Sequence, residues 1–365
     1  MKLAIITLHR LYNYGSVLQA YATQRIFERK GYDTVVIDYI TEQRTLKRQL
    51  FGKRPHGLKG TIHRLFKPFS IFIKEQTFGR FIKKNLNITQ RCVTFEDLQK
   101  LPPFDIYVTG SDQTWNSFYN EGVDRGFFLD FTDSNEKYAF AASFGKNELD
   151  PSEKEQTKQY LSKYKAISTR EIQGKKILDD LGFTKSVCII DPTLQIDKQE
   201  WLSISSKRLI KKKYVILMLL YQEDNGATEY ARKIADDKGF ELVKISWEFF
   251  KPKLVDKLMT HRTPNEFLSL FNYAEFVVTN SFHGLAFSIN LNKQFVIVPR
   301  NEFNSRINSL LSICGLESRL VKSMDDVLRE ANSIIDYQIV NKRLNAERKL
   351  ADKFIEDNFF GVNND

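Results

Sequence analysis

Residues 276–284 read FVVTNSFHG, and this stretch decides which kind of fold the chain adopts. Its first three residues form a short apolar run, as in a buried strand. Asn280 and Ser281 are residue types that cap the start of a helix, and an apolar helical pattern continues from Leu285. A buried strand that leads into a helix is typical of a parallel α/β sheet, in which ligands bind beyond the carboxyl ends of the strands.

His283 stands at this strand-to-helix turn and is one of only five histidines in the chain. The N–H groups at a helix start attract anions, and a histidine there can exchange protons near neutral pH. We expect His283 to act as a general acid or as a phosphate ligand, with Ser281 and Gly284 beside it in the donor site. The alternative is a histidine that caps or packs the turn.

Strands and helices alternate through most of the chain, which favours an α/β protein. We expect two Rossmann-like domains that face each other across a cleft, the GT-B-like arrangement, with a long C-terminal helix. The domains are expected at residues 1–200 and 201–335, and the helix, at 336–365, would pack back across both. Apolar runs predict strands at residues 2–7, 34–39, 105–109, 138–142, 166–168, 186–190, 214–220, 241–245, 276–278 and 294–299.

The composition is that of a soluble globular protein, with 42% hydrophobic and 27% charged residues among 365. No stretch approaches the ~20 continuous apolar residues of a membrane-spanning helix, and the N-terminal apolar run is too short for a signal peptide. Cys92, Cys188 and Cys314 are too widely spaced to predict a metal site or a disulfide framework. A reducing cytoplasm is therefore expected.

The net charge of +10 favours an anionic substrate or an anionic surface, and no nucleic-acid-binding motif accompanies it. Residues 44–91 are rich in basic and aromatic residues and contain one carboxylate, Glu75. This insertion is expected to hold the protein at a membrane surface as an amphipathic element. The alternative is that Phe78, Phe81 and Ile82 cover the N-terminal sheet while the lysines are solvated.

Polar loops follow two expected strands of the N-terminal domain. The first contains a glycine that would let the backbone approach a ligand, and the second reads GSDQTWN at residues 110–116. We expect Trp115 to stack on a sugar or fill the cleft wall, and Asp112 to accept a proton from a hydroxyl. The alternative is a pair of turns held by their own side-chain hydrogen bonds. The residues expected to bind the acceptor are Asn13, Tyr14, Gly15, Trp115 and Asn116.

Three arginines follow strand ends, where they are expected to bind a carboxylate or phosphate. Arg170 lies between a strand and a helix, where its alternative role is a local pair with Glu171. Arg300 and Arg306 follow the strand that ends at Pro299. Asp191, directly before a proline, points to the same rim or caps a turn.

Together these segments resemble the polysaccharide pyruvyl transferase family. The resemblance runs from the first strand to about Leu320 and rests on short motifs in one order. These are NYG at 13–15 with VLQAY at 17–21, GSDQ at 110–113 with WN at 115–116, Ser168 with RE at 170–171, DPT at 191–193 and NSFHG at 280–284.

The resemblance implies a GT-B-like fold and transfer of the enolpyruvyl carbons of phosphoenolpyruvate onto two sugar hydroxyls, giving a cyclic pyruvate ketal. Family members have an Arg-Leu-His turn whose arginine and histidine contact the donor. Here the matching residues are Ser281, Phe282 and His283, so the histidine is kept and the arginine is absent. Either the donor differs, or another arginine such as Arg170, Arg300 or Arg306 takes its place.

We therefore expect a pyruvyl transferase that acts on a sugar of a surface polysaccharide, a capsule or exopolysaccharide, or on its lipid-linked precursor. It would work in the cytoplasm or peripherally at the inner face of the membrane. Phosphoenolpyruvate would be a co-substrate, with no cofactor and no metal. The alternatives are a GT-B glycosyltransferase that uses a nucleotide sugar and a non-catalytic glycan-binding or assembly protein.

Overall fold

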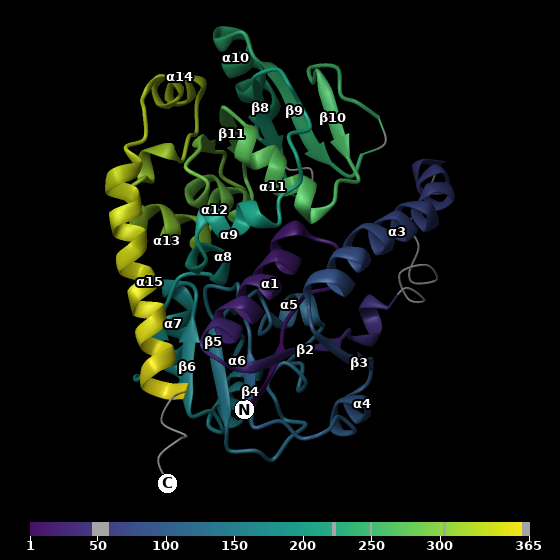
Figure 1. The fold of residues 1–365 in the computed structure, drawn as a ribbon, viewed down its shortest axis with the longest axis vertical. Coiled ribbons are helices and arrows are strands. Elements are labelled where there is room, and N and C mark those ends of the chain that lie inside the picture. The colour runs from purple at the N-terminus through teal and green to yellow at the C-terminus, as the bar shows by residue number, and fades with distance from the viewer. Residues whose placement is uncertain (46–57, 221–223, 249, 302–303, 360–365) are drawn as a thin grey trace. The chain divides into compact units, whose positions relative to one another are not determined.

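The computed structural model describes residues 1–45, 58–220, 224–248, 250–301 and 304–359 (Figure 1). The chain divides into two compact units, Met1–Pro192 and Thr193–Asp365. This division falls ahead of the expected boundary at residue 200. The reason is that residues before 200 are bonded into unit 2: the Thr193 carbonyl accepts from Trp201 Nε1 in helix α9 (Lys198–Ser203), and the carbonyls of Thr193 and Ile196 accept from Asn290 Nδ2.

Unit 1 is built on a seven-stranded parallel sheet with the order β3-β2-β1-β4-β5-β6-β7. The strands are β1 (Lys2–Ile6), β2 (Asp33–Tyr39), β3 (Ile88–Cys92), β4 (Ile106–Thr109), β5 (Lys137–Ala142), β6 (Ala166–Thr169) and β7 (Val187–Cys188). The order reverses between β1 and β4, and such a switch point is where doubly wound sheets bind ligands. The loops after these strands therefore carry the candidate site of unit 1.

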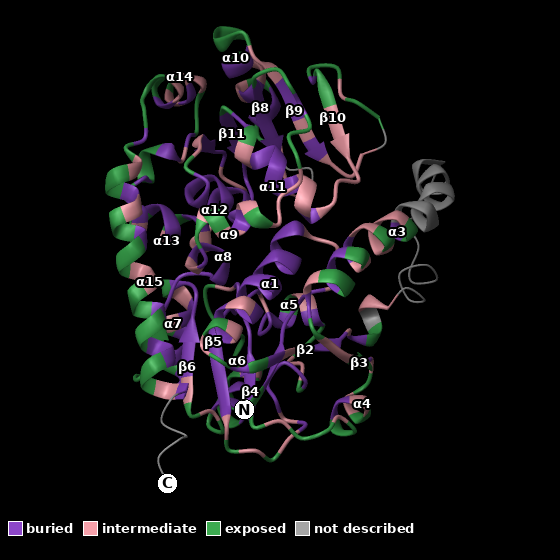
Figure 2. Cartoon of the chain, viewed as in Figure 1, coloured by how far each residue is buried: buried purple, intermediate pink, exposed green. Residues whose placement is uncertain are grey.

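The helices of unit 1 follow the strands in the expected alternation. They are α1 (Tyr14–Arg29), the 3₁₀ helix η1 (Glu42–Arg44), α3 (Leu58–Asn85), α4 (Phe95–Gln99), α5 (Ser117–Asn120), α6 (Pro151–Leu161) and α7 (Ile172–Asp180). Figure 2 shows the central strands of the sheet as buried. The core includes Leu3, Ile5, Val108 and Phe140, each fully buried, because parallel strands are covered on both faces.

The described C-terminal part of α3 packs on α1. Phe78 places its ring 5.3 Å from that of Tyr14, and Phe81 lies 6.1 Å from Tyr21, both measured between centroids. Phe78, Phe81 and Ile82 are buried, whereas Phe72 is 60% exposed. The burial that the alternative predicts for these three residues is thus confirmed, and the two phenylalanine rings contact α1. The rest of the basic insertion, residues 46–57 and the side chains of 58–70, lies outside the described residues, so membrane contact stays a prediction.

Unit 2 is built on a five-stranded parallel sheet with the order β10-β9-β8-β11-β12. The strands are β8 (Tyr214–Met218), β9 (Glu241–Ser246), β10 (Lys257–Thr260), β11 (Phe276–Thr279) and β12 (Gln294–Ile297). The helices, besides α9 and the short α8 (Pro192–Gln195) at the junction, are α10 (Ala227–Lys238), α11 (Pro264–Tyr273), α12 (Phe282–Asn290), α13 (Ser305–Cys314), η2 (Glu317–Arg319), α14 (Met324–Asn332) and α15 (Tyr337–Phe359). The order reverses between β8 and β11, so this unit also has a Rossmann-like switch point.

The long C-terminal helix is present as α15 and groups with unit 2. Its expected apolar face is buried, and Figure 2 shows green, exposed segments along the rest of the helix. Arg348 Nε donates to the carbonyl of Leu194 at 2.8 Å, which ties the helix to the start of unit 2. Packing of this helix across both units stays a prediction. No helix of the described chain is long and apolar enough to cross a membrane.

Candidate active site

A buried arginine organises the carboxyl edge of the sheet in unit 1. Arg170 follows β6, and its side chain is fully buried. Its Nη1 donates to Asp191 Oδ2 at 2.7 Å and its Nη2 donates to Asp112 Oδ1 at 3.1 Å. Glu171 Oε2 lies 3.8 Å from Arg170 Nε. We call Arg170, Asp112, Asp191, Ser16 and Ser111 the Arg170 cluster.

The two serines extend this cluster to the other motifs. Ser16, in the first turn of α1, donates through Oγ to Asp112 Oδ2 at 2.5 Å. Ser111, after β4, donates to Asp191 Oδ2 at 3.0 Å. Four segments that are far apart in the sequence, following β1, β4, β6 and β7, therefore meet in one buried network. Such a network holds the loops around the switch point in a single arrangement.

This geometry does not support the roles expected for Arg170 and Asp112. Burial alone would lower the pKa of Arg170, but the charges of Asp191, Asp112 and Glu171 outweigh it and raise the pKa, so the guanidinium stays charged. Its terminal nitrogens are bonded to carboxylates and are not presented to a donor. Asp112 accepts from Ser16, Arg170 and its neighbour Gln113, which leaves little capacity to take a proton from a sugar hydroxyl.

Trp115 is a core residue, so the expected sugar contact is corrected. Its side chain is 2% exposed and stacks on Phe128, with ring centroids 5.5 Å apart and planes 11° from parallel. Its Nε1 donates to the Phe127 carbonyl at 3.2 Å. Phe144 covers another side of the indole at 5.0 Å. The indole ring thus packs inside unit 1. A sequence pattern alone does not distinguish such a core tryptophan from one that contacts a ligand.

Asn13 and Asn116 stabilise their own turns by hydrogen bonds from their side chains, which is the alternative to binding the acceptor. Asn13 caps α1 by accepting from Gly15 N, and Asn116 caps α5 by accepting from the N–H groups of Phe118 and Tyr119. These bonds occupy the side-chain oxygens of two residues that were expected to bind the acceptor. Tyr14 is 4% exposed and packs against Phe78, so its side chain belongs to the core of unit 1.

An ionic group that no sequence motif predicted lies at the carboxyl ends of β1 and β2. His9 Nε2 lies 3.0 Å from Asp38 Oδ1, Arg10 bonds both oxygens of Asp38, and Arg91 Nε lies 3.5 Å from Asp38 Oδ2. We call these four residues the Asp38 cluster. Burial would raise the pKa of Asp38, but the hydrogen bonds from His9 and Arg10 outweigh it and hold the pKa well below its usual range. The dipeptide His9-Arg10 directly after the first strand was the available signal.

In unit 2, His283 lies where the sequence predicted, at the start of α12 and directly beyond β11. Ser281 is the N-cap residue and accepts from Gly284 N at 3.2 Å. His283 is the second residue of the helix and is 7% exposed. Its ring meets that of Phe282 edge-on at 5.1 Å. The turn therefore brings an imidazole to a helix N-terminus, where anions are stabilised.

The neighbouring residues hold this turn rigidly. Asn280 Oδ1 accepts from Leu220 N at 2.7 Å, and Thr279 Oγ1 donates to the Met218 carbonyl at 2.6 Å, so the ends of β8 and β11 are bonded together. A Cβ at Gly284 would lie 2.5 Å from Thr279 Oγ1, closer than real contacts allow. Glycine at this position thus permits the close approach of helix and strand.

Arg306 places a positive charge next to Phe282, the residue before the histidine. Arg306 is the second residue of α13, and its guanidinium carbon lies 5.7 Å from the centre of the Phe282 ring, a cation–π distance. Arg300 lies earlier, in the loop between β12 and α13, where its N–H donates to Asn304 Oδ1. Of the expected donor residues, Ser281 and Gly284 lie in the same turn as His283, Arg306 contacts the neighbouring Phe282 ring, and Arg170 lies in unit 1.

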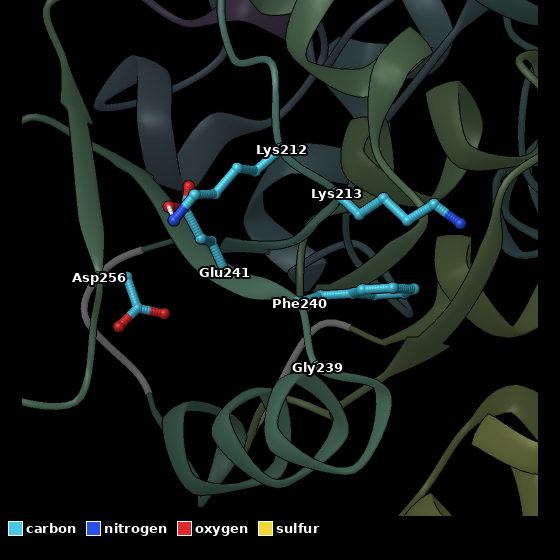
Figure 3. Close-up of a pocket in the computed structure, with 6 residues that line it drawn as sticks. All are labelled: Lys212, Lys213, Gly239, Phe240, Glu241 and Asp256. Carbon is cyan, nitrogen blue, oxygen red and sulfur yellow. Dashed lines mark ion pairs between the residues drawn. The ribbon is translucent and has the colours of Figure 1, made fainter.

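A separate hollow of about 510 Å³ opens at the amino ends of β8 and β9 (Figure 3). It lies at the opposite end of the sheet from His283, since Lys212 and Lys213 precede β8. Its charges pair with neighbours: Lys212 with Glu241 at 3.1 Å, and Asp256 with Arg232 at 2.7 Å. We assign it no role in the chemistry. Within the described parts of the chain, no group of three His, Cys, Asp or Glu residues could hold a metal ion.

Solved structures of low sequence identity share this fold. A UDP-GlcNAc 2-epimerase from Methanocaldococcus jannaschii has a TM-score of 0.51 at 12% identity, over 98% of this chain and 100% of its own. A UDP complex of MnaA from S. aureus also scores 0.51, at 11% identity over 98% and 95% of the two chains. The epimerase from Neisseria meningitidis bound to UDP-GlcNAc scores 0.50, at 11% identity over 99% and 100%. The expected GT-B-like α/β fold is thereby confirmed.

No curated protein matches the chain in sequence. The sequence profile of one family does match, over residues 13–302, and that span contains both the Arg170 cluster and the His283 turn. The chain belongs to the polysaccharide pyruvyl transferase family.

Proposed function

We propose that the protein transfers a pyruvyl group from phosphoenolpyruvate onto a sugar of a surface polysaccharide or its lipid-linked precursor, forming a ketal. The observation that carries this proposal is the His283 turn. It combines an imidazole, a helix N-terminus and, through the Phe282 ring, the guanidinium of Arg306. Phosphoenolpyruvate carries a phosphate and a carboxylate, and these groups are what such a turn binds.

The reaction requires one proton at carbon and one at phosphate. His283 donates a proton to the methylene carbon of the donor, which becomes a methyl group and leaves a cationic centre at C2. A first sugar hydroxyl adds to C2, phosphate leaves and a second hydroxyl closes the ketal. Of the two hydroxyl protons, one restores His283 and the other leaves on the phosphate. Arg306 at the start of α13, and Arg300 in the loop before it, stabilise the departing phosphate in place of the arginine that the family turn carries.

We place the acceptor on the loop after β4 in unit 1, with Phe118 in place of the buried Trp115. Phe118 is 73% exposed, although its loop is firmly held. Asn116 accepts from its N–H at 3.1 Å, and Arg44 donates to the Tyr119 carbonyl and to Asn120 Oδ1 at 3.1 and 2.9 Å. A large, solvent-exposed aromatic ring on a well-anchored segment is suited to packing against the C–H face of a sugar.

Calorimetric titration with phosphoenolpyruvate and with UDP-GlcNAc separates this proposal from a nucleotide-sugar transferase. We expect binding of phosphoenolpyruvate that weakens about tenfold or more in Arg306→Gln, because a charge-assisted hydrogen bond contributes about 1.5–3 kcal/mol. Arg329→Gln, an exposed arginine of α14, is the matched control. Binding of UDP-GlcNAc without phosphoenolpyruvate would favour the glycosyltransferase. Binding of neither would favour a non-catalytic glycan-binding protein.

A further inference from the structure

A run of basic residues connects α9 to β8 at the amino end of the sheet in unit 2. It reads KRLIKKK over residues 207–213, and we call these seven residues the basic tract. Its four lysines and its arginine are all exposed. Exposed lysines and arginines are cationic at neutral pH, so the charge of the tract does not depend on the protonation state of a histidine.

Carboxylates of the surrounding elements neutralise little of this charge. Within the part of unit 2 that the structure describes, only Lys212 of the tract forms an ion pair, with Glu241 at 3.1 Å (Figure 3). Glu241 also pairs with Lys257 at 2.7 Å, and Asp256 pairs with an arginine of α10. Glu275, directly before β11, adds one further negative charge close by. The tract therefore keeps an excess of positive charge that faces solvent.

Hydrogen bonds hold the backbone of the tract in one conformation. Arg208 Nε donates to the Ile210 carbonyl at 2.7 Å, and its Nη2 donates to the Lys211 carbonyl at 3.0 Å. Ser269 of α11 donates through Oγ to the Lys207 carbonyl at 3.0 Å, which ties the tract to the body of unit 2. A charged surface that is already ordered loses less conformational entropy when it binds a partner.

Two apolar side chains are exposed among these cations. Leu209, inside the tract, is 38% exposed, and Tyr273, the last residue of α11, is 37% exposed. The guanidinium carbon of Arg208 lies 5.2 Å from the centre of the Tyr273 ring, so the ring belongs to the same surface. Aliphatic and aromatic side chains enter the headgroup region of a bilayer, while basic residues bind its anionic headgroups. A soluble polyanion makes no use of the apolar side chains, so the combination favours a lipid surface.

We propose that the basic tract, together with Tyr273, docks unit 2 onto an anionic lipid surface. Its lysines bind the lipid phosphates, and Leu209 and Tyr273 lie in the headgroup region. This surface goes beyond the proposed function and is separate from the insertion at residues 44–91. Docking would concentrate the protein on the surface that carries a lipid-linked acceptor.

Sedimentation with vesicles tests this surface without any turnover. We expect the wild type to bind vesicles of equal parts phosphatidylcholine and phosphatidylglycerol, to ignore phosphatidylcholine alone, and to dissociate as salt is raised. Lys207→Gln/Lys211→Gln should bind the mixed vesicles roughly 20-fold more weakly, since each basic residue near an anionic surface contributes about fivefold in affinity. Lys207→Arg/Lys211→Arg, which keeps the charge, should bind as the wild type does. The matched control is Lys154→Gln/Lys158→Gln, at two exposed lysines of α6 in unit 1.

A second variant, Leu209→Ser, distinguishes a lipid surface from a soluble polyanion. It should weaken binding to the mixed vesicles and leave binding to dextran sulfate unchanged, and hydrogen exchange of unit 2 verifies that each variant is folded. Equal vesicle binding by Lys207→Gln/Lys211→Gln and the wild type would overturn the docking surface. Binding to dextran sulfate without binding to vesicles, or no effect of Leu209→Ser, would overturn lipid as its partner. The proposed function fails on a different readout, the absence of phosphoenolpyruvate binding and of ketal product.

Discussion

Replacing Arg170 by alanine should destabilise unit 1 strongly. The substitution would leave Asp112 and Asp191 buried, close together and without their cation. Breaking a buried ion pair by removing one partner costs about 3–5 kcal/mol, because the remaining charge is uncompensated. An exposed pair contributes only about 0–1 kcal/mol. The matched control is therefore Arg25→Ala, which removes a 41% exposed arginine paired with Glu28 on α1.

Urea unfolding combined with hydrogen exchange would measure this effect unit by unit, since a chain with two units need not unfold in one step. We expect a large loss of protection in the peptides of unit 1 for Arg170→Ala and a small change for Arg25→Ala. The double variant Arg170→Ala/Asp191→Asn should recover part of the loss, because one uncompensated charge is removed with its partner. Equal stability of Arg170→Ala and the wild type, with weaker phosphoenolpyruvate binding, would refute a structural role and restore the donor role expected from the sequence.

Three further predictions concern the site and the fold. His283→Ala should lower the rate of ketal formation, measured by mass spectrometry of the product, by ~10²–10⁴ and leave the free energy of unfolding almost unchanged. The control His261→Ala, outside the turn, should keep the wild-type rate, and a near wild-type rate for His283→Ala would contradict the role of His283 as general acid. Phe118→Ala should raise the KM for the acceptor more than the KM for phosphoenolpyruvate, whereas Phe72→Ala, at another exposed phenylalanine, should change neither KM. If the two variants had equal effects on the KM for the acceptor, the acceptor would bind elsewhere. Burial lowers the pKa of Lys293 from 10.5 to about 8, with the charge of Lys198 adding to the effect. The unfolded state then binds more protons than the folded state between about pH 8 and 10.5, so wild-type stability should rise with pH across that window relative to Lys293→Met, and parallel pH profiles of urea unfolding would contradict this.

The buried strands of both sheets and the local structure of the turn at His283 could be predicted from the sequence alone. Strands such as β8 and β11 are buried on both faces, so their residues must be apolar in continuous runs, and the runs are visible without a structure. The caps and glycine of the His283 turn are local as well, since Ser281 bonds a residue three positions later. The face of α15 follows from helical periodicity alone.

The tertiary structure decided what depends on distant neighbours. The edge strands β3 and β10 carry exposed polar residues, so they lack the apolar signal and were not predicted. Whether Arg170 binds a ligand or a carboxylate depends on Asp112 and Asp191, which are 58 and 21 positions away along the chain. Trp115 and Phe118 are three positions apart, and only packing against Phe128 buries one while the other stays in water. Contacts between residues that are distant in the sequence form only when the strands assemble into the sheet, so the local sequence pattern does not reveal them.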